Sequence, residues 1–426
     1  MLTRTLQRVA PNTNRILVPD DISDLVRIDQ ASEADPGEVG MTREGVDAIW
    51  RAVEDHYRTG FQPAISLCVR RRGRIVINRS VGHSHGGAPL GDGGQGIEVC
   101  SPSTPFCVFS ASKAVTAMLI HLLDERGLLH IDDRVVEYIP EFGKHGKDTI
   151  TVRHVLTHRA GIPFASGGSD DDLNLIGDWD AVIRLLCEAE PESTHGRRVS
   201  YHAITGGFIL GEIIQRVTGK SFTEVVETEL RGPLGTSWFH FGIDRSSMPL
   251  VARSAMLGEA PTPPFSHLFK RAIGADFPRI PDIANDPRFL GAVVPSGNLV
   301  ATAEEMTRFY QLLLDGGTFG GKRVFEPRTV RRARNESAYF EVDHTLVLPV
   351  RYGLGFMLGG RHVSLFGADT EFAFGHLGFT NTYTWADPAR DISVALLTTG
   401  KTFVPYELWV QREILSAIAE HCPRVR

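Results

Sequence analysis

The sequence predicts an α/β plus all-α fold, in which an antiparallel sheet flanked by helices carries an inserted helical domain. Residues 64–70 and 74–80 have strand patterns joined by the tight turn Arg71-Arg72-Gly73, which indicates a β-hairpin. Strand patterns return near the other end of the chain, over residues 352–358, 380–386 and 392–398. The residues between these two groups have mainly helical patterns, so both ends of the chain are expected to form one sheet.

This arrangement predicts three segments. Residues 1–40 carry several prolines and acidic residues without periodicity, and they are expected to form an N-terminal arm over the body. Residues 41–130 and 301–426 are expected to form the α/β domain, and residues 131–300 the inserted, mainly helical domain. Helical periodicity is clearest over residues 178–188 and 205–218, and helices are also expected over residues 303–315 and 405–421.

Residues 260–287 are rich in proline and aromatic residues, and they are predicted to form a long loop. Loops of this length are uncommon in compact domains unless they serve a function. We therefore expect this stretch to form a wall of a substrate pocket.

Composition excludes several classes of protein. The chain has 426 residues, of which 42% are hydrophobic and 23% charged, so it can build a large core. A net charge of -6 gives no reason to expect nucleic acid or an anionic membrane surface as partner. No apolar run is long enough to span a bilayer, and the first residues lack the apolar core of a signal peptide. A soluble cytoplasmic protein is expected, and composition does not predict its oligomeric state.

The cysteines support the same expectation. The chain has five, and none forms a C-x-x-C pair. Neither a disulfide framework nor a zinc site is predicted, which favours a reducing compartment.

Ser110 and Lys113 begin the stretch that is expected to carry the chemistry. Ser110 precedes apolar residues at helical spacing, so it is expected at a helix start, where serine is a common N-cap. Lys113 lies one turn along on the same face, and the pair forms the S-x-x-K pattern of a serine nucleophile with a lysine base. The positive end of the helix would stabilise an oxyanion and lower the pKa of the lysine. Because this pattern also occurs by chance, further partners are required.

Ser84 is a competing nucleophile. Gly82-His83-Ser84-His85-Gly86 matches the G-x-S-x-G elbow pattern, but the glycine-rich residues that follow cannot form the helix that the elbow requires. We therefore expect Ser84 to be a loop serine. His83 and His85 have no acidic or thiol residue at a usual ligand spacing and are expected to be solvated.

His154 and His158 have the i,i+4 spacing of a helical metal pair. The glutamate of H-E-x-x-H is missing between them, so structural hydrogen bonds are the better expectation. No metal site is predicted.

Two later stretches are candidates to complete the site. Tyr201 lies in a loop that runs into a helix, and it is the best candidate for a second proton-handling group. Residues 374–385 are typical of an edge strand whose glycines let a ligand approach the backbone, which suits an oxyanion hole.

Together these motifs resemble the serine β-lactamase and penicillin-binding-protein-like hydrolases, especially the class VIII carboxylesterases, which look like class C β-lactamases. The resemblance runs from about Thr42 to the C-terminus. The motifs that carry it are Ser110-Ala111-Ser112-Lys113, residues 151–163, Tyr201-His202-Ala203, residues 296–302 and residues 375–379. It implies a β-lactamase/transpeptidase-like fold with the site at the domain boundary.

The resemblance also implies roles for individual residues. Ser110 would be the acylated nucleophile and Lys113 its base partner, and Tyr201 would share the base role and protonate the leaving alcohol. The backbone N–H groups of Ser110 and Phe379 would form the oxyanion hole. His376 and Gly378 would contact the substrate, which is a small-molecule ester; no cofactor is implied.

Two departures from the β-lactamase pattern bear on the substrate. Ala203 replaces the asparagine of Y-x-N, and His376-Leu377-Gly378 stands where β-lactamases have K-T-G. The lysine that attracts the β-lactam carboxylate is lost, and a mostly neutral histidine replaces it poorly. A serine carboxylesterase for short or medium acyl esters is therefore expected. The alternatives are a β-lactamase or D-amino peptidase, an acyltransferase to an alcohol acceptor, and a non-catalytic module of the same fold.

Overall fold

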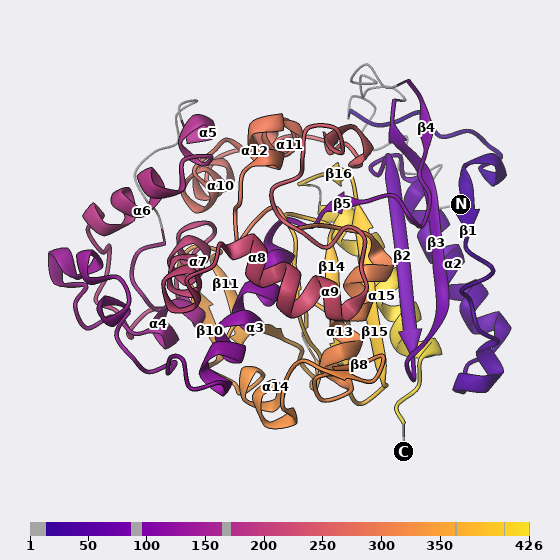
Figure 1. The fold of residues 1–426 in the computed structure, drawn as a ribbon. Coiled ribbons are helices and arrows are strands. Elements are labelled where there is room, and N and C mark those ends of the chain that lie inside the picture. The colour runs from indigo at the N-terminus through magenta and orange to yellow at the C-terminus, as the bar shows by residue number, and fades with distance from the viewer. Residues whose placement is uncertain (1–13, 87–95, 164–171, 363, 404, 426) are drawn as a thin grey trace.

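A computed structural model describes residues 14–86, 96–163, 172–362, 364–403 and 405–425 of the chain. Within these residues the centre of the molecule is a ten-stranded antiparallel sheet (Figure 1). In spatial order its strands are β1 (Val26–Ile28), β3 (Arg74–His85), β2 (Ala64–Arg71), β15 (Ile392–Thr398), β14 (Tyr383–Asp387), β13 (Phe374–Leu377), β12 (Met357–Leu358), β11 (Leu348–Tyr352) and β10 (Ala338–Asp343), with β4 (Glu98–Val99) paired to β3.

The two ends of the chain meet at the middle of this sheet. The predicted hairpin of β2 and β3 is confirmed, and β2 pairs on its other side with β15, in a register that sets Leu67 opposite Leu396. Every residue of β2 and β15 is buried. Such near-continuous apolar runs belong to strands that are covered on both faces.

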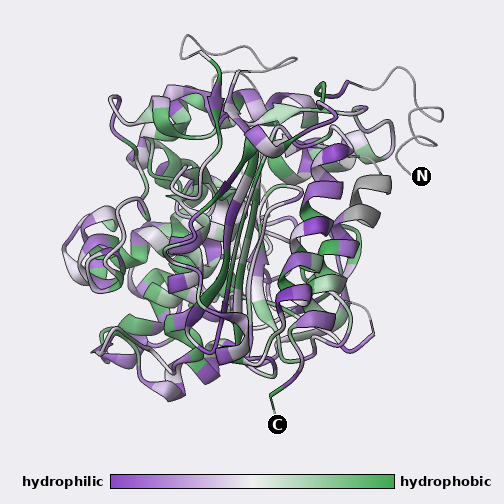
Figure 2. Ribbon diagram, turned by 90° about the vertical axis from the view of Figure 1, so that its right-hand side faces the viewer, coloured by the Kyte–Doolittle hydropathy of each residue, from purple (hydrophilic) through white to green (hydrophobic). Residues whose placement is uncertain are grey.

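Helices cover both faces of the sheet. Strands β2 and β15 pack on α13 (Ala303–Leu314) on one face, while α2 (Arg43–Arg58) and α15 (Pro405–His421) pack together on the other. Figure 2 shows the hydrophobic strands nearly edge-on between the two helical layers. Side chains alternate along β2 as this requires: Leu67 belongs to one core cluster and Cys68 to the other.

The other α-helices lie mainly between the two strand-forming ends of the chain. They are α3 (Ser112–Glu125), α4 (Val152–Leu156), α5 (Asp172–Leu175), α6 (Trp179–Glu188), α7 (Thr205–Thr218), α8 (Phe222–Val226), α9 (Gly232–Leu234), α10 (Phe265–Ile273), α11 (Ile280–Asn285), α12 (Pro287–Gly291) and α14 (Pro327–Ala333). Short strand pairs join β5 (Phe106–Cys107) to β7 (Val300–Ala301), β6 (Ala255–Met256) to β16 (Gly400–Lys401), and β8 (Thr318–Phe319) to β9 (Lys322–Arg323).

The helices predicted over residues 178–188, 205–218, 303–315 and 405–421 are confirmed as α6, α7, α13 and α15. Their ends follow local chemistry: the Asp178 side chain accepts a hydrogen bond from the N–H of Ala181 at the start of α6, and Gly219 ends α7 in the left-handed conformation. The predicted arm contributes β1 to the sheet through pairing with β3. The division into domains at residues 130 and 300 stays a prediction.

The prediction of a loop over residues 260–287 is wrong, because this stretch forms α10 and α11. Pro281 lies in the first turn of α11, where a missing N–H costs no helical hydrogen bond. The prolines that suggested a loop therefore mark a helix start.

Two late strands differ from the prediction. The strand expected over residues 352–358 is interrupted at Gly355, which has φ 107. The strand expected from Thr380 begins only at Tyr383, because Thr380 and Asn381 have positive φ. Turn geometry, which apolar periodicity does not report, sets both boundaries.

The prediction that residues 374–385 form an edge strand is also wrong. They form the hairpin of β13 and β14, and β12 lies on the far side of β13. Strand β12 reaches only Phe374 and Gly375, however. Among the described residues, His376 and Leu377 therefore have a strand partner on the β14 side alone, and the end of β13 stays open for a ligand.

Ser84 is not a loop residue as predicted. Strand β3 continues to His85, and both Ser84 and His85 are buried, so the prediction of a solvated His85 is wrong as well. The glycine-rich residues after it, 87–95, lie outside the described residues. Ser84 thus occupies a strand interior and not the sharp turn that an elbow nucleophile needs.

Candidate active site

Ser110 follows a strained turn that two strands hold in place. Strand β5 pairs with β7, and the Ser112 hydroxyl accepts a hydrogen bond from the N–H of Leu299 at 3.0 Å. Between these anchors Phe109 has φ 50, a left-handed value that is costly for an aromatic residue. Strain of this kind persists only where the surroundings enforce it, as they do directly before Ser110.

The expectation that Ser110 is the N-cap of the following helix is wrong. Ser110 lies in a 3₁₀ turn over Phe109–Ala111, and α3 begins at Ser112 without a side-chain cap. The residues of α3 are buried as far as Leu123, so the helix is held by apolar packing all round. The Ser110 hydroxyl is consequently available for other partners.

Lys113 meets Ser110 from the first turn of α3. Its Nζ atom lies 3.1 Å from the Ser110 Oγ, and it donates hydrogen bonds to the carbonyl oxygens of Ala203 at 2.7 Å and Ser296 at 2.9 Å. The side chain is buried, and burial lowers the pKa of Lys113 well below its usual value. The surroundings thus favour a neutral amine beside the hydroxyl.

Tyr201 approaches the same hydroxyl from the segment before α7. Its ring centre lies 4.8 Å from the Lys113 Nζ, and the Ser110 side chain acts on the pKa of its phenol. Burial raises the pKa of Tyr201 above its usual value, so the phenol keeps its proton at neutral pH. Ser110, Lys113 and Tyr201, which are separate in the sequence, form one cluster.

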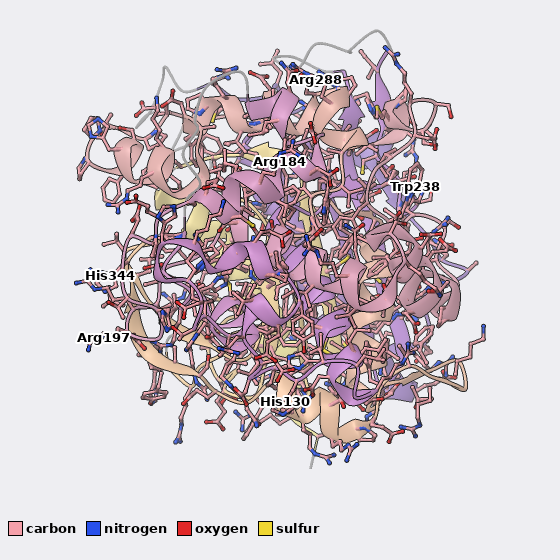
Figure 3. The ribbon with its side chains drawn as sticks, turned by 60° about the vertical axis from the view of Figure 1, so that its left-hand side comes forward. His130, Arg184, Arg197, Trp238, Arg288 and His344 are labelled. Atoms are coloured by element: carbon pink, nitrogen blue, oxygen red, sulfur yellow. The ribbon has the colours of Figure 1, made fainter. Side chains whose placement is uncertain are left out.

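Asp343 fixes the backbone of Tyr201. This buried carboxylate, at the end of β10, accepts N–H groups from Tyr201 at 3.1 Å, Thr345 at 2.8 Å and Leu346 at 2.9 Å. The neighbouring His344 N–H donates to the carbonyl of Val199 at 2.8 Å. Figure 3 shows His344 and Arg197 near each other on one side of the molecule, where the two segments meet.

His158 supports Tyr201 from another direction. Its ring lies 4.8 Å from the Tyr201 ring, and its Nδ1 accepts the N–H of His202 at 3.1 Å. Its carbonyl accepts the N–H of Ser200 at 2.8 Å. Burial lowers the pKa of His158 well below its usual value, and the Nδ1 contact fits a neutral ring that carries its proton on Nε2.

The pairing of His154 with His158 on one helix face is not observed. Helix α4 ends at Leu156, and His158 turns inward with φ 58. His154 instead caps α4, where its Nδ1 accepts the N–H of Thr151 at 3.1 Å. The prediction of structural hydrogen bonds for both histidines is confirmed.

The backbone at Gly378 and Phe379 passes next to the segment that carries Ser110. A side chain at Gly378 would place its Cβ 2.6 Å from the carbonyl oxygen of Val108, so only glycine fits. The rings of Phe109 and Phe379 lie 5.9 Å apart, centre to centre. The two amides predicted for the oxyanion hole, of Ser110 and Phe379, therefore belong to adjoining segments.

His376 lies behind Tyr201 and outside the lining of the cavity beside Ser110. Its side chain is buried, its Nδ1–H donates to the carbonyl of Leu377 at 2.8 Å, and its ring lies 6.2 Å from the Tyr201 ring. Burial, together with the nearby Lys113, lowers the pKa of His376 to about 3. A neutral ring at this position cannot attract a carboxylate.

A cavity of about 880 Å³ opens beside Ser110. Its lining includes Tyr201, Gly378 and Phe379, together with Phe269 of α10 and Ile283 of α11. The stretch predicted as a pocket wall thus does line the cavity, as helices. A volume of this size falls in the range of ordinary small-molecule sites.

Sequence reasoning missed Lys401, a buried lysine in β16. Its Nζ donates to the carbonyl of Thr398 at 3.0 Å and lies 3.4 Å from the Thr382 hydroxyl. Burial lowers the pKa of Lys401 to about 7. Nothing in its local sequence marks it, because only the pairing of β16 with β6 brings it inside. Asp343 was missed for a similar reason, since it ends an otherwise ordinary strand.

Two features are absent from the part of the chain that the structure describes. Among its residues no group of His, Cys, Asp and Glu side chains could hold a metal ion. In the same part of the chain, no helix has the length and apolarity to cross a membrane. The five cysteines are free and buried. A cytoplasmic location stays a prediction.

Comparisons with known proteins agree with this geometry. The family model described as Beta-lactamase matches residues 50–416. The esterase/beta-lactamase LipL of Mycobacterium tuberculosis is 31% identical over 302 residues, which cover 68% of each chain.

Two solved structures have the same fold. A penicillin-binding protein homologue from Caulobacter crescentus superposes with a TM-score of 0.72 at 26% identity, covering 89% of this chain and 99% of that one. A family VIII carboxylesterase superposes with a TM-score of 0.76 at 23% identity, covering 90% and 99%. With the family model matching most of its length, the chain belongs to the beta-lactamase family and is a serine hydrolase.

Proposed function

We propose that the protein is a serine carboxylesterase that works through an acyl-enzyme on Ser110. The observation that carries the proposal is the contact of 3.1 Å between the Lys113 Nζ and the Ser110 Oγ at the edge of a cavity. The similarity to LipL, whose name includes esterase activity, and to a family VIII carboxylesterase supports the same reaction class.

Lys113 is the base in the resting enzyme under this proposal. A neutral amine has two N–H groups and one lone pair, and the carbonyls of Ala203 and Ser296 accept the two N–H groups. The lone pair then faces the Ser110 hydroxyl. After proton transfer the same carbonyls stabilise the ammonium, whereas burial holds Tyr201 as a phenol and makes its phenolate a poor resting base.

Acylation follows from this arrangement. The Ser110 Oγ forms a bond to the ester carbonyl carbon as its proton moves to the Lys113 Nζ, and the oxyanion accepts N–H groups from Ser110 and Phe379. One such donor is typically worth about 3 kcal/mol of transition-state stabilisation. When the carbon–oxygen bond of the alcohol breaks, Tyr201 gives its phenol proton to the leaving oxygen, and the proton on Lys113 restores the phenol.

Deacylation uses the same groups in reverse. A water molecule attacks the acyl carbonyl and gives a proton to the Tyr201 oxygen as the phenol proton of Tyr201 moves to the Lys113 Nζ. The Lys113 ammonium then returns a proton to the Ser110 Oγ as the carbon–oxygen bond to Ser110 breaks and the acid leaves. An alcohol in place of water would give acyl transfer, which product analysis with added alcohol distinguishes from hydrolysis.

The surroundings favour esters over β-lactams. His376 is buried and neutral, and Ala203 has no side-chain amide to contact an acylamino group. A charged hydrogen bond to the β-lactam carboxylate is worth about 1.5–3 kcal/mol, and that contribution is missing here. Turnover of nitrocefin is therefore expected to be at least about tenfold poorer in kcat/KM than turnover of a simple ester. In this proposal His376 supports Tyr201, and Gly378 contacts the substrate through its backbone.

The test is hydrolysis of p-nitrophenyl butyrate by the wild type and by Ser110→Ala, Lys113→Ala and Tyr201→Phe, with Ser84→Ala as the control. The three site variants should lose activity by about a hundredfold or more, and the control should keep it. A fluorophosphonate should add one adduct to the wild type and none to Ser110→Ala. Full activity or labelling of Ser110→Ala would overturn the assignment.

A further inference from the structure

A row of aromatic rings leads away from the nucleophile along one wall of the cavity. Phe109 adjoins Ser110, and its ring is followed by that of Phe379 and then by that of Phe277, whose centre lies 5.0 Å from the Phe379 centre. The Phe269 ring lies 5.0 Å from the Phe277 ring. Phe109, Phe379 and Phe269 line the cavity, and Phe277 packs behind them.

The row continues to the surface of the molecule. Phe403 lies 5.2 Å from Phe269, and Phe265 lies 5.5 Å from Phe403, again between ring centres. Phe265, at the start of α10, is 51% exposed. The aromatic wall therefore extends without a break from the reacting serine to solvent.

Aliphatic side chains contribute other parts of the lining. They come from the region of α5, from α6 and from the connection between β10 and β11, and they include Leu173, Ile176, Val182, Leu185, Leu346 and Leu348. A cavity lined by rings and aliphatic groups releases ordered water when an apolar group enters it.

Charges are confined to the outer rim. The charged residues in the described lining are Glu192, Lys270, Arg271, Asp276 and Arg279, and all five are exposed. Two pairs among them neutralise each other, Arg271 with Glu192 at 2.6 Å and Lys270 with Asp276 at 3.2 Å. Within the described lining, the inner surface of the cavity offers a ligand no charge.

We propose that this cavity binds a bulky apolar group of a neutral ester, on its acyl or its alcohol side, and that the preferred substrates are larger than short-chain esters. This inference rests on the proposed esterase function. An acetyl or butyryl group would leave most of about 880 Å³ unfilled, whereas a long alkyl or aryl group would contact both walls. The sequence, which predicted short or medium acyl chains, carries no measure of this volume.

The first experiment compares two series of esters. In one series p-nitrophenyl acetate, butyrate, hexanoate and octanoate vary the acyl side, and in the other the acetates of 1-butanol, 1-hexanol and 1-octanol vary the alcohol side. The value of kcat/KM should rise about fourfold for each buried methylene in the series that occupies the cavity. A flat or falling profile in both series would overturn the inference.

A cavity-filling variant provides the second experiment. Ile283 lines the cavity and is partly buried, so Ile283→Trp should lower the ratio of kcat/KM for the long ester to that for the short ester by at least tenfold. Leu250→Trp is the matched control, because Leu250 is 52% exposed and outside the described lining. Equal ratios in Ile283→Trp and wild type would count against the cavity as the site of chain binding.

Binding to Ser110→Ala separates this inference from the proposed function. With calorimetry, 1-octanol should bind about two hundredfold more tightly than 1-butanol, since four more methylenes are buried. A difference under tenfold would overturn the inference even if esters are hydrolysed. Tight binding of 1-octanol by a protein that hydrolyses no ester would instead uphold the apolar site and refute the esterase.

Discussion

The Nζ atom of Lys401 lies 4.7 Å from the centre of the Phe109 ring. The same atom approaches the hydroxyl of Thr382, whose carbonyl accepts the N–H of Gly378 at 2.8 Å. One buried lysine thus connects the strained residue before Ser110 with the turn that carries the second amide of the proposed oxyanion hole. Because Lys401 is outside the described cavity lining, we expect it to support the proposed oxyanion hole without touching the substrate.

Replacing Lys401 by methionine, an unbranched side chain of similar length, should therefore lower activity. A desolvated cation–π contact is worth about 2 kcal/mol, and losing a part of it should reduce kcat/KM about tenfold with p-nitrophenyl butyrate. Lys147→Met is the matched control, because Lys147 is also buried and lies 5.3 Å from the Phe142 ring, outside the cavity lining. Equal activities of the two variants would refute the role of Lys401.

Lys401 also predicts a pH dependence of stability. Its pKa is about 7 in the folded protein, whereas in the unfolded chain it returns to the ordinary lysine value of 10.5. Between these values the unfolded chain binds the extra proton, so the contribution of Lys401 to the free energy of unfolding rises with pH. Between pH 6 and pH 9 the gain in melting temperature should be smaller for Lys401→Met than for the wild type. An identical gain in both proteins would contradict this assignment.

The charge state of Lys113 should govern the acid limb of the activity profile. The amine must be neutral to accept the Ser110 proton, so kcat/KM should increase as pH rises through the lowered pKa of Lys113. Lys113→Arg keeps a cation that cannot deprotonate, and it should lose about a thousandfold in kcat/KM at every pH. An arginine variant with more than a tenth of wild-type activity would exclude Lys113 as the base.

Gly378→Ala should damage the oxyanion hole specifically. The added Cβ would lie 2.6 Å from the Val108 carbonyl oxygen, and the backbone must move to relieve the overlap. Loss of one oxyanion donor costs about a hundredfold or more in kcat, with a smaller effect on KM. Gly177→Ala is the control, since its Cβ would meet nothing nearer than 3.8 Å. If both variants keep wild-type kcat, Phe379 does not supply the amide.

Asp343 should act as a positioning residue for Tyr201. Asp343→Ala removes the acceptor of three backbone N–H groups, which should lower both the melting temperature and kcat. Asp343→Asn retains an acceptor oxygen and should recover most of kcat. If Asp343→Ala and Asp343→Asn have equal melting temperatures but unequal kcat, the effect on kcat arises at Tyr201. If Asp343→Asn does not restore kcat, the charge of Asp343 itself is required.

The sequence predicted what local pattern and ordered motifs can report. The hairpin of β2 and β3, the long helices, and the Ser110, Lys113 and Tyr201 set could be identified before the fold was known. Asp343, Lys401 and the contact of His158 with Tyr201 could not, because each depends on residues far away in the chain. Helices α10 and α11 were missed because the prolines that indicated a loop lie at helix starts. The volume of the cavity could not be predicted because it depends on packing alone.

The pairing of β2 with β15 has a consequence for the synthesis of this protein. Strand β2 leaves the ribosome long before β15, and at about 5–20 residues per second the delay amounts to tens of seconds. During that time a strand that is buried along its whole length in the folded protein has an unpaired edge, which can add to the edge of another chain. Production in a host should therefore benefit from slower translation at low temperature or from a holdase that covers this edge until the last strands emerge.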